Sequence, residues 1–390
     1  MKRYIIRTGE GDAFNAASKA RQDAEAIALR RGYEPFPFQG KRTADQSVTA
    51  AIQLAVTGYR NWKALTNKTQ PGDIVLIQYP HYPMKSAYLA KAMMKRAQKN
   101  HVRFIALIHD LDSLRGYHGK AARYSDTHLL PLFDAIICHN ERMKEYLVSQ
   151  SIPKNKLIPL EIFDYLTTEK ETPDTTKKTN TPATQTNPSK TGLAIAGNLD
   201  PDKTGYIQKL INAAITTNNT ANPSTTTTTN TNTYTTTTTT TATTTLPLHL
   251  YGKGLKDEDL KNLPPHVTYH GSFPPAELPE KLEGRYGLVW DGPEITTCAG
   301  KQGAYLKYNN PHKLSLYLAA GLPVILWRGA AEADFVRRTH TGILTDSLTD
   351  IRFPGNEEEL KKNAKALSKD LRAGKYLTQA LEKAEQLLAE

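Results

Sequence analysis

The segment HDLDSLR, residues 109–115, gathers a histidine, two aspartates and an arginine directly after an apolar run that is typical of a buried strand. His109 or Asp110 is a candidate general base, able to take a proton from a hydroxyl group. Asp110 and Asp112 also form a D-x-D pair, but nothing nearby completes a shell of ligands for a hard cation. We therefore expect no metal here. The remaining alternative is a His-Asp pair that caps the following turn.

The string KYNNPHKLSLYLAAGLPVI, residues 307–325, is the most specific in the chain. Pro311 suits the first turn of a helix, which a Gly-Leu-Pro sequence then ends. Asn309 and Asn310 lie at the expected helix start, where backbone N–H groups and the helix dipole favour a phosphate. Lys313, one turn further, is placed to reach the same anion. The alternative is an ordinary helix-strand unit with a solvated lysine.

Further polar residues and glycines follow other expected strands. Asn15 comes after the first strand, Asn198 and Lys203 after the first strand of the second half, and Tyr251-Gly252 at the end of another. Ligands of parallel α/β sheets bind at the carboxyl ends of the strands. We therefore expect two rows of polar loop tips that face each other.

Apolar strands alternate with helices in both halves of the chain, which predicts an α/β fold with two Rossmann-like, doubly wound domains facing each other across a cleft. We expect an N-terminal domain over residues 1–166 and a flexible linker over 167–191, which is rich in Thr, Pro and Lys. A C-terminal domain follows over 192–370, and a helix over 371–390 ends the chain.

Residues 216–245 consist almost entirely of threonine and asparagine. Such a tract buries too little apolar surface to offset the entropy of ordering it. We expect a disordered insertion on the surface of the C-terminal domain.

The net charge of +11 is concentrated in the first third of the chain, where residues 1–130 hold 21 Lys and Arg against 10 Asp and Glu. This excess indicates attraction to an anion such as a nucleotide diphosphate or an acidic membrane surface, or merely a solvated basic surface. We expect no nucleic-acid partner, because no recognisable nucleic-acid-binding module accompanies the charge.

Only two cysteines are present, Cys138 and Cys298, so neither a disulfide framework nor a zinc pattern can be built from them. No apolar stretch is long enough for a signal peptide or a membrane span. We expect a soluble protein of the cytoplasm.

With these strings, the chain resembles the bacterial β-1,6-galactofuranosyltransferases and the related glucosyltransferases of the GT-B fold. The resemblance covers nearly all of the chain outside the linker and the threonine tract. Its motifs are HDLDSLR at 109–115, AGNLDPD at 196–202, YGKG at 251–254, GLVWDG at 287–292 and the 307–325 string.

The resemblance implies a UDP-sugar donor held by the C-terminal domain, an acceptor held by the N-terminal domain, and no cofactor. The catalytic residues would be His109 and Asp110. Leu316 occupies the position where many GT-B enzymes carry a glutamate that bonds the ribose, so that contact is lacking. The implied donor-binding residues are Lys203, Asn309, Asn310 and Lys313 at the phosphates and Tyr251 and Gly252 at the uridine, with Asn15 closing the site from the other side. Asn198 is a further donor-binding candidate from its position after a strand.

The expected reaction is transfer of a hexosyl group, namely galactofuranosyl, from a UDP-sugar to a glycan acceptor in cell-surface polysaccharide biosynthesis. A lipid-linked acceptor would bring the basic first third to the inner face of the membrane. Two alternatives are a glucosyltransferase acting on GlcNAc-modified, Ser/Thr-rich protein and a non-catalytic partner subunit. Threonines of the 216–245 tract as sugar acceptors and a homo-oligomeric state also remain open.

Overall fold

A computed structural model provides the structure of the chain. Side chains at a few positions within the described ranges, Asp202 and Lys203 among them, lie outside the description. The structure describes residues 1–7, 16–39, 47–80, 87–115, 125–167, 191–213, 216–218 and 243–389.

The N-terminal domain contains a six-stranded parallel sheet with the strand order β2-β1-β3-β4-β5-β6. Its strands are β1 (Arg3–Arg7), β2 (Glu34–Pro37), β3 (Ile74–Tyr79), β4 (Arg103–Ile108), β5 (Ala135–Cys138) and β6 (Leu157–Pro159). The helices that accompany them are α1 (Ala16–Arg30), α2 (Val48–Lys68), α3 (Ala87–Lys99), the short α4 (Asp112–Arg115) and α6 (Glu141–Ser149), with 3-10 turns at Leu130–Leu132 and Lys154–Lys156.

Helices cover both faces of this sheet, which explains why its central strands are mostly apolar. All six residues of β3 are buried. Val75 and Ile77 point toward α2 and α3, whereas Ile74 and Leu76 point toward α1 on the opposite face. Successive side chains of a strand alternate between the faces, so each face receives its own apolar layer.

The C-terminal domain repeats the architecture with the strand order β11-β10-β7-β12-β13-β14, again all parallel. The strands are β7 (Leu193–Asn198), β10 (Leu248–Lys253), β11 (Val267–Tyr269), β12 (Tyr286–Val289), β13 (Val324–Trp327) and β14 (Gly342–Thr345). The helices are α7 (Pro201–Thr204), α8 (Tyr206–Ala213), α9 (Asp257–Lys261), α10 (Gly300–Tyr305), α11 (His312–Ala319) and α12 (Ala333–Thr339), with a 3-10 turn at Leu278–Glu280.

Helix α11 packs unusually close to this sheet. A Cβ atom on Gly287 of β12 would lie 2.1 Å from the ring of Tyr317, so only glycine fits beneath that ring. The Tyr317 hydroxyl in turn accepts a hydrogen bond of 2.7 Å from the backbone N–H of Ala196 in β7. These contacts hold α11 against β7 and β12.

The two ends of the threonine tract pair with each other, which corrects the expectation that all of residues 216–245 are disordered. β8 (Thr216–Asn218) and β9 (Thr243–Thr245) form a two-stranded antiparallel ladder. Threonine has a high strand propensity, so its enrichment favours such a ladder once a chain reversal brings the ends together. Residues 219–242 lie outside the described part of the chain.

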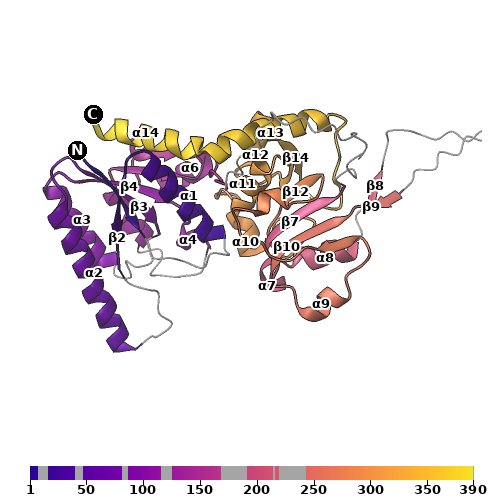
Figure 1. The fold of residues 1–390 in the computed structure, drawn as a ribbon, viewed down its shortest axis with the longest axis horizontal. Helices are drawn as coiled ribbons and strands as arrows, with labels where there is room; N and C mark the ends of the chain where they lie inside the picture. The colour runs from indigo at the N-terminus through magenta and orange to yellow at the C-terminus, as the bar shows by residue number, and fades with distance from the viewer. Residues whose placement is uncertain are drawn as a thin grey trace, which may run out of the picture.

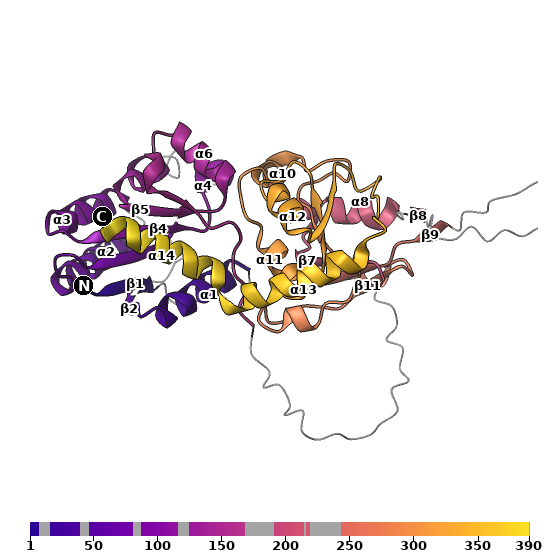
Figure 2. The same cartoon turned by 90° about the horizontal axis from the view of Figure 1, so that it is seen from above.

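The last two helices cross from one domain to the other (Figures 1 and 2). α13 (Glu357–Ala373) packs on α11 of the C-terminal domain, and α14 (Lys375–Ala389) packs on α1 and β5 of the N-terminal domain. Gly374 joins them in a left-handed conformation with φ of 80°. The chain therefore has its first and last segments in the same domain.

Side chains in α14 complete the core and the polar surface of the N-terminal domain. Leu377 and Leu381 are buried with residues of α1 and the first sheet. The Asp164 carboxylate accepts the backbone N–H of Leu377 at 2.7 Å and caps the helix start. Glu385 forms ion pairs with Arg3 at 3.0 Å and Arg31 at 2.8 Å.

The expected fold class is confirmed, and α11 follows Pro311 as the 307–325 string predicted. β2, α9, α10, α12 and β14 are among the elements that were not anticipated. Within the described residues, no helix has both the length and the apolar character needed to cross a membrane.

Candidate active site

The carboxyl ends of the two sheets are joined by direct contacts, and we call this region the domain junction. From the N-terminal domain it contains the segments after β4 and β5, residues 109–111 and 139–140. From the C-terminal domain it contains residues 305–313, between α10 and α11. The contacts include hydrogen bonds from Asn140 to Asn310 and from Arg142 to the carbonyl of Gly329.

Asp110 lies at the centre of the domain junction. Its Oδ2 atom is 2.8 Å from the Arg115 guanidinium, and its Oδ1 atom accepts a hydrogen bond of 3.3 Å from the Tyr305 hydroxyl of the opposite domain. Burial raises the pKa of Asp110 above its ordinary value, although Arg115 and Tyr305 each lower it and Asp112 raises it further. A carboxylate with a raised pKa is a stronger base than an ordinary aspartate.

The Tyr305 hydroxyl also accepts the backbone N–H of Leu111 at 3.0 Å. One side chain of the C-terminal domain therefore contacts both Asp110 and Leu111, which follow β4. This arrangement fixes the orientation of the Asp110 carboxylate relative to the C-terminal domain.

His109 is deeply buried beside Asp110, and its ring stacks on Phe163 at 5.5 Å. The Nε2 atom lies 2.8 Å from the Gln78 side-chain oxygen, so Nε2 carries the proton and Nδ1 carries the lone pair. Burial, assisted by the charges of Arg21 and two neighbouring histidines, lowers the pKa of His109 far below its ordinary value. The ring is therefore neutral and a much weaker base than an exposed histidine.

Asn310 connects the domains through nearly all of its polar atoms. Its backbone N–H donates to His139 Nδ1 at 2.8 Å, and its amide nitrogen donates to the carbonyls of His139 at 2.7 Å and Glu161 at 3.1 Å. Its side-chain oxygen accepts from Asn140 at 2.6 Å. The predicted contact of Asn310 with a donor phosphate stays a prediction, and in this structure the residue holds the junction together.

Lys313 points to the carboxyl end of β12. Its Nζ atom donates to the Trp290 carbonyl at 2.9 Å and lies 2.7 Å from Asp291 Oδ1. Both charged side chains are partly exposed. These two contacts hold the Lys313 side chain in place. It is therefore not the solvated lysine of the alternative interpretation.

Two neighbours of Lys313 carry buried polar atoms without a hydrogen-bond partner among the described residues. These are the side-chain oxygen of Asn309 and both ring nitrogens of His312. The His312 ring stacks on Phe163 at 5.3 Å, and burial lowers the pKa of His312 to about 3. Buried polar atoms normally have partners, so such a concentration marks a place where a ligand or water belongs.

The ends of β7 and β10 form a close backbone cradle. Gly252 has a φ of 137°, and a Cβ atom there would lie 1.8 Å from the carbonyl oxygen of Gly197 on the neighbouring strand. The Asn198 side chain accepts the backbone N–H of Asp200 at 2.9 Å and so shapes the turn into α7. Both residues lie at the expected sheet edge.

Tyr251 is placed differently from its predicted role beside the uridine. Its side chain is buried, its ring stacks on His270 at 4.5 Å, and its hydroxyl donates to the Lys281 carbonyl and accepts from the Glu283 N–H. Only its backbone remains to contact a ligand. Asn15 and the Lys203 side chain lie outside the described residues, while Leu316 is buried in the apolar core.

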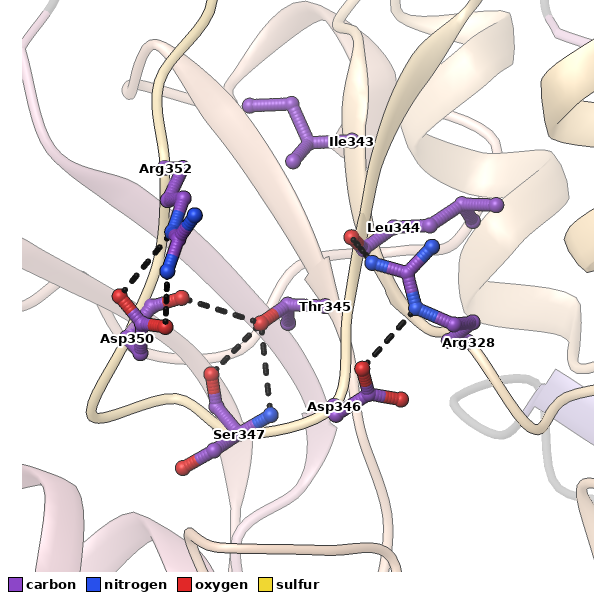
Figure 3. A pocket seen from close by; sticks show the side chains of 8 residues that line it. All are labelled: Arg328, Ile343, Leu344, Thr345, Asp346, Ser347, Asp350 and Arg352. Atoms are coloured by element: carbon purple, nitrogen blue, oxygen red, sulfur yellow. Dashed lines mark hydrogen bonds and ion pairs between the residues drawn. The ribbon is translucent and has the colours of Figure 1, made fainter.

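A cavity of about 360 Å³ lies further along the same edge, at the carboxyl ends of β13 and β14 (Figure 3). Arg328 pairs with Asp346 at 3.0 Å, and Arg352 pairs with Asp350 at 3.3 Å. Each cation in the cavity therefore has its own carboxylate. The lining residues are Arg328, Ile343, Leu344, Thr345, Asp346, Ser347, Asp350 and Arg352.

Comparison with known proteins decides the family. Models for the N-terminal and C-terminal domains of the glucosyltransferase 3-like family match residues 2–162 and 226–384. The β-1,6-galactofuranosyltransferase WbbI of Escherichia coli K12 is 32% identical over 290 residues, which cover 72% of this chain and 70% of that protein. The chain belongs to the glucosyltransferase 3-like family of glycosyltransferases.

A second relative agrees with this membership, and a solved structure agrees with the fold. Glucosyltransferase 3 of Streptococcus gordonii is 34% identical over 92 residues, 23% of this chain and 27% of that protein. The lipopolysaccharide outer core galactosyltransferase WaaB, in its apo form, has a TM-score of 0.53 at 14% identity, covering 98% of this chain and 99% of that one. The glycosyltransferase has the GT-B fold and is a hexosyltransferase.

Sequence reasoning missed three residues of this glycosyltransferase's junction. His139 and Asn140 follow β5 directly, so the rule that flagged His109 and Asp110 after β4 applies to them equally. Tyr305 gave no such signal, because it lies inside α10, a helix within a segment expected to be a loop. Only the packing of the domains brings its hydroxyl to Asp110.

Proposed function

We propose that this glycosyltransferase transfers a hexosyl group from a UDP-sugar to a glycan acceptor at the domain junction. The observation that carries the proposal is the position of Asp110, a partly exposed carboxylate held between domains by Arg115 and Tyr305. In this proposal the acceptor hydroxyl approaches from the N-terminal domain, and the donor lies against the C-terminal domain.

Asp110 is the proposed general base. The acceptor hydroxyl gives its proton to a carboxylate oxygen of Asp110 while the hydroxyl oxygen bonds to the anomeric carbon and the UDP leaves. The raised pKa of Asp110 supports this role, since a base works best when its pKa approaches the working pH. His109 is a positioning residue, because its buried, neutral ring is stacked on Phe163 and bonded to Gln78.

The donor diphosphate lies at the start of α11 in this proposal. Lys313 supplies a cation, and the helix start supplies N–H groups and the positive end of the dipole. The backbone cradle at Gly252 lets the nucleoside approach the strand ends closely. These groups neutralise the leaving UDP without a resident metal ion, and the pairing of Asp110 with Arg115 supports this, since it occupies one carboxylate of the D-x-D pair.

Galactofuranosyl is the proposed sugar, because WbbI, whose name states a β-1,6-galactofuranosyltransferase, matches 72% of the chain. Glucosyl transfer is the second candidate, supported by the shorter match to glucosyltransferase 3. We propose cell-surface polysaccharide as the product class, and an acceptor presented at the inner face of the membrane.

An exposed face of the N-terminal domain supports an acceptor at the membrane. Val48, Ile52, Val56 and Tyr59 lie along α2 at helical spacing, and their side chains are 43–76% exposed. The neighbouring helix α3 also exposes basic side chains, including Lys95 and Arg96. A domain that exposes both an apolar stripe and cations suits contact with anionic lipid.

Vesicle binding tests this face. Ile52→Glu is expected to weaken co-sedimentation with anionic vesicles at least about threefold, because it places a charge in the apolar stripe. Val148→Glu on α6, a comparably exposed position, serves as the control and is expected to bind as the parent does. Equal binding of both variants, or no dependence on salt, contradicts membrane contact.

A donor panel tests the reaction itself. UDP-galactofuranose, UDP-galactopyranose, UDP-glucose and GDP-sugars are compared for hydrolysis and for transfer to lipid-linked glycans and glycopeptides. UDP-galactofuranose is expected to be turned over fastest, with transfer to the lipid-linked glycan. Preference for UDP-glucose with a glycopeptide establishes the second candidate, and inactivity with all UDP-sugars overturns the proposal.

A further inference from the structure

We propose that His249, His270 and Glu283 form a binding site for one Zn²⁺ ion on the C-terminal domain. His249 lies in β10, His270 directly follows β11, and Glu283 lies just before β12. Among the described residues, these three form a cluster whose potential ligand atoms all lie within 4.8 Å of one another. Two imidazoles and one carboxylate are a ligand set that zinc accepts, with water in the fourth position.

The distances suit a shared ion. His249 Nδ1 lies 3.1 Å from His270 Nε2 and 3.9 Å from Glu283 Oε2. Ligand atoms at ~2.0–2.2 Å from a tetrahedral zinc lie ~3.3–3.5 Å apart, so the two histidines are already near that separation. The Glu283 side chain is 58% exposed and can move toward the ion.

The hydrogen bonding of His249 prepares one ligand atom. Its Nε2 atom lies 3.1 Å from the Thr191 carbonyl oxygen, which can only accept, so Nε2 carries the proton. The lone pair of His249 is therefore on Nδ1 and points to His270. A carbonyl that fixes the tautomer of a ligand histidine is the usual outer-shell partner of a zinc site.

Tyr251 positions the other two ligands. Its ring stacks on His270 at 4.5 Å with an angle of 4° between the planes. Its hydroxyl accepts the backbone N–H of Glu283 at 2.8 Å and donates to the Lys281 carbonyl at 3.2 Å. One buried side chain thus sets both the plane of His270 and the path of the Glu283 segment.

The two histidines can bind the ion without a change in net protonation. Without the ion, His270 Nε2 donates its proton to His249 Nδ1; with the ion, that proton resides on His270 Nδ1. Zinc binds neutral imidazole.

This site is separate from the domain junction. His249 is the second residue of β10, whereas Lys253 at the other end of β10 lies at the carboxyl edge of the sheet. Four residues of strand span about 13 Å. The ion would join three chain segments of the sheet edge and stabilise the C-terminal domain without taking part in transfer.

The test uses the full chain, free of any histidine tag and stripped of metal by a chelator. Zn²⁺ is titrated in competition with a chromogenic chelator. We expect one tight equivalent, a rise in melting temperature of a few degrees, and absorption bands of four-coordinate Co²⁺ when cobalt replaces zinc. His270→Gln and Glu283→Gln are expected to weaken Zn²⁺ binding at least about tenfold.

His101→Asn, at an exposed histidine with a φ of 59° that asparagine tolerates, is the matched control and is expected to leave Zn²⁺ binding unchanged. If His270→Gln fails to fold, the exposed Glu283→Gln still gives the answer. Binding that is unchanged in Glu283→Gln, or absent in the parent, overturns the site. The shift of melting temperature by UDP is expected to be the same in all variants, so failure of this site is distinguishable from failure of the proposed transfer reaction.

Discussion

The carboxyl edges of the two parallel sheets are built alike but carry different groups. On the N-terminal sheet, titratable side chains follow the strands directly: His109 and His139 are buried, and Asp110 is partly exposed. On the C-terminal sheet, the strand ends bring backbone close to backbone at Gly252 and present a partly exposed ion pair, Lys313 with Asp291.

The difference assigns complementary tasks to the two edges. Burial raises the pKa of Asp110 toward the range in which a general base works, whereas it lowers the pKa values of His109 and His139, whose rings stay neutral. Backbone N–H groups and an accessible lysine instead suit a diphosphate, whose charge does not change during binding. The following variants test this division, in order of decreasing effect.

Asp110→Asn is expected to lower turnover by about 10²–10⁴-fold, because the amide cannot take the proton of the acceptor. The KM for the UDP-sugar is expected to stay nearly constant, since the donor lies on the other sheet. Steady-state kinetics measures both quantities. Asp346→Asn, at an exposed position outside the junction, is the matched control. If the KM for the UDP-sugar rises while turnover is unchanged, Asp110 contacts the donor, and the two edges do not have separate tasks.

Lys313→Ala is expected to weaken UDP binding by about 10–100-fold, because a hydrogen bond to a charged group contributes about 1.5–3 kcal/mol. Isothermal titration with UDP measures the change. Lys209→Ala, which removes an exposed lysine paired with Glu294, is expected to bind UDP normally. Unchanged affinity in Lys313→Ala would move the diphosphate away from the start of α11.

The histidines of the junction predict a pH dependence of stability. Burial lowers the pKa of His312 from 6.5 to about 3, so below pH 6.5 the unfolded chain takes up a proton that the folded protein does not. Stability is therefore lost as the pH falls below 6.5, by about 1.4 kcal/mol per pH unit for each such ring.

His312→Phe keeps the stack on Phe163 and removes the two unpartnered ring nitrogens. Between about pH 6.5 and about pH 5, the parent is expected to lose about 2 kcal/mol more stability than this variant. Denaturant unfolding at several pH values measures the difference, with His101→Asn as the control. Parallel pH profiles of the parent and His312→Phe would show that His312 is not buried as a neutral ring.

Tyr305→Phe has the smallest expected effect and probes the contact between the two edges. The Tyr305 hydrogen bond lowers the pKa of Asp110, so its removal raises that pKa further. The acidic limb of the kcat/KM profile is expected to move up by about 0.4–1 pH unit, as the loss of about 0.5–1.5 kcal/mol implies. If the acidic limb of the profile does not move, Asp110 is not the group that accepts the proton.

Much of this arrangement was predictable from the sequence, because parallel strands buried on both faces are continuous apolar runs. The apolar run before His109 was recognised in this way as the strand β4, and the rule for strand ends pointed to Asp110. β2 was missed because its sequence, EPFP, has two prolines and only one buried residue, so it lacks the signal of a central strand.

The contacts between domains were beyond the sequence. Nothing in the string around Asn310 shows that its amide faces His139 and Glu161, residues about 150 positions earlier, since that depends on how two folded units meet. The side chain of Tyr251 illustrates the same limit. Its position at a strand end was predicted, but the face of the sheet on which its ring packs was not.

The crossing of α13 and α14 has a consequence for biosynthesis. The N-terminal domain emerges from the ribosome before the C-terminal domain, yet Leu377, Leu381 and Glu385, which pack on the N-terminal domain, are made only after the C-terminal domain. N-terminal domains usually fold during synthesis, ahead of the rest of the chain. Here the apolar surface of the N-terminal domain that α14 covers stays exposed until α14 has been made. A prematurely terminated chain would therefore expose that surface to chaperones and proteases.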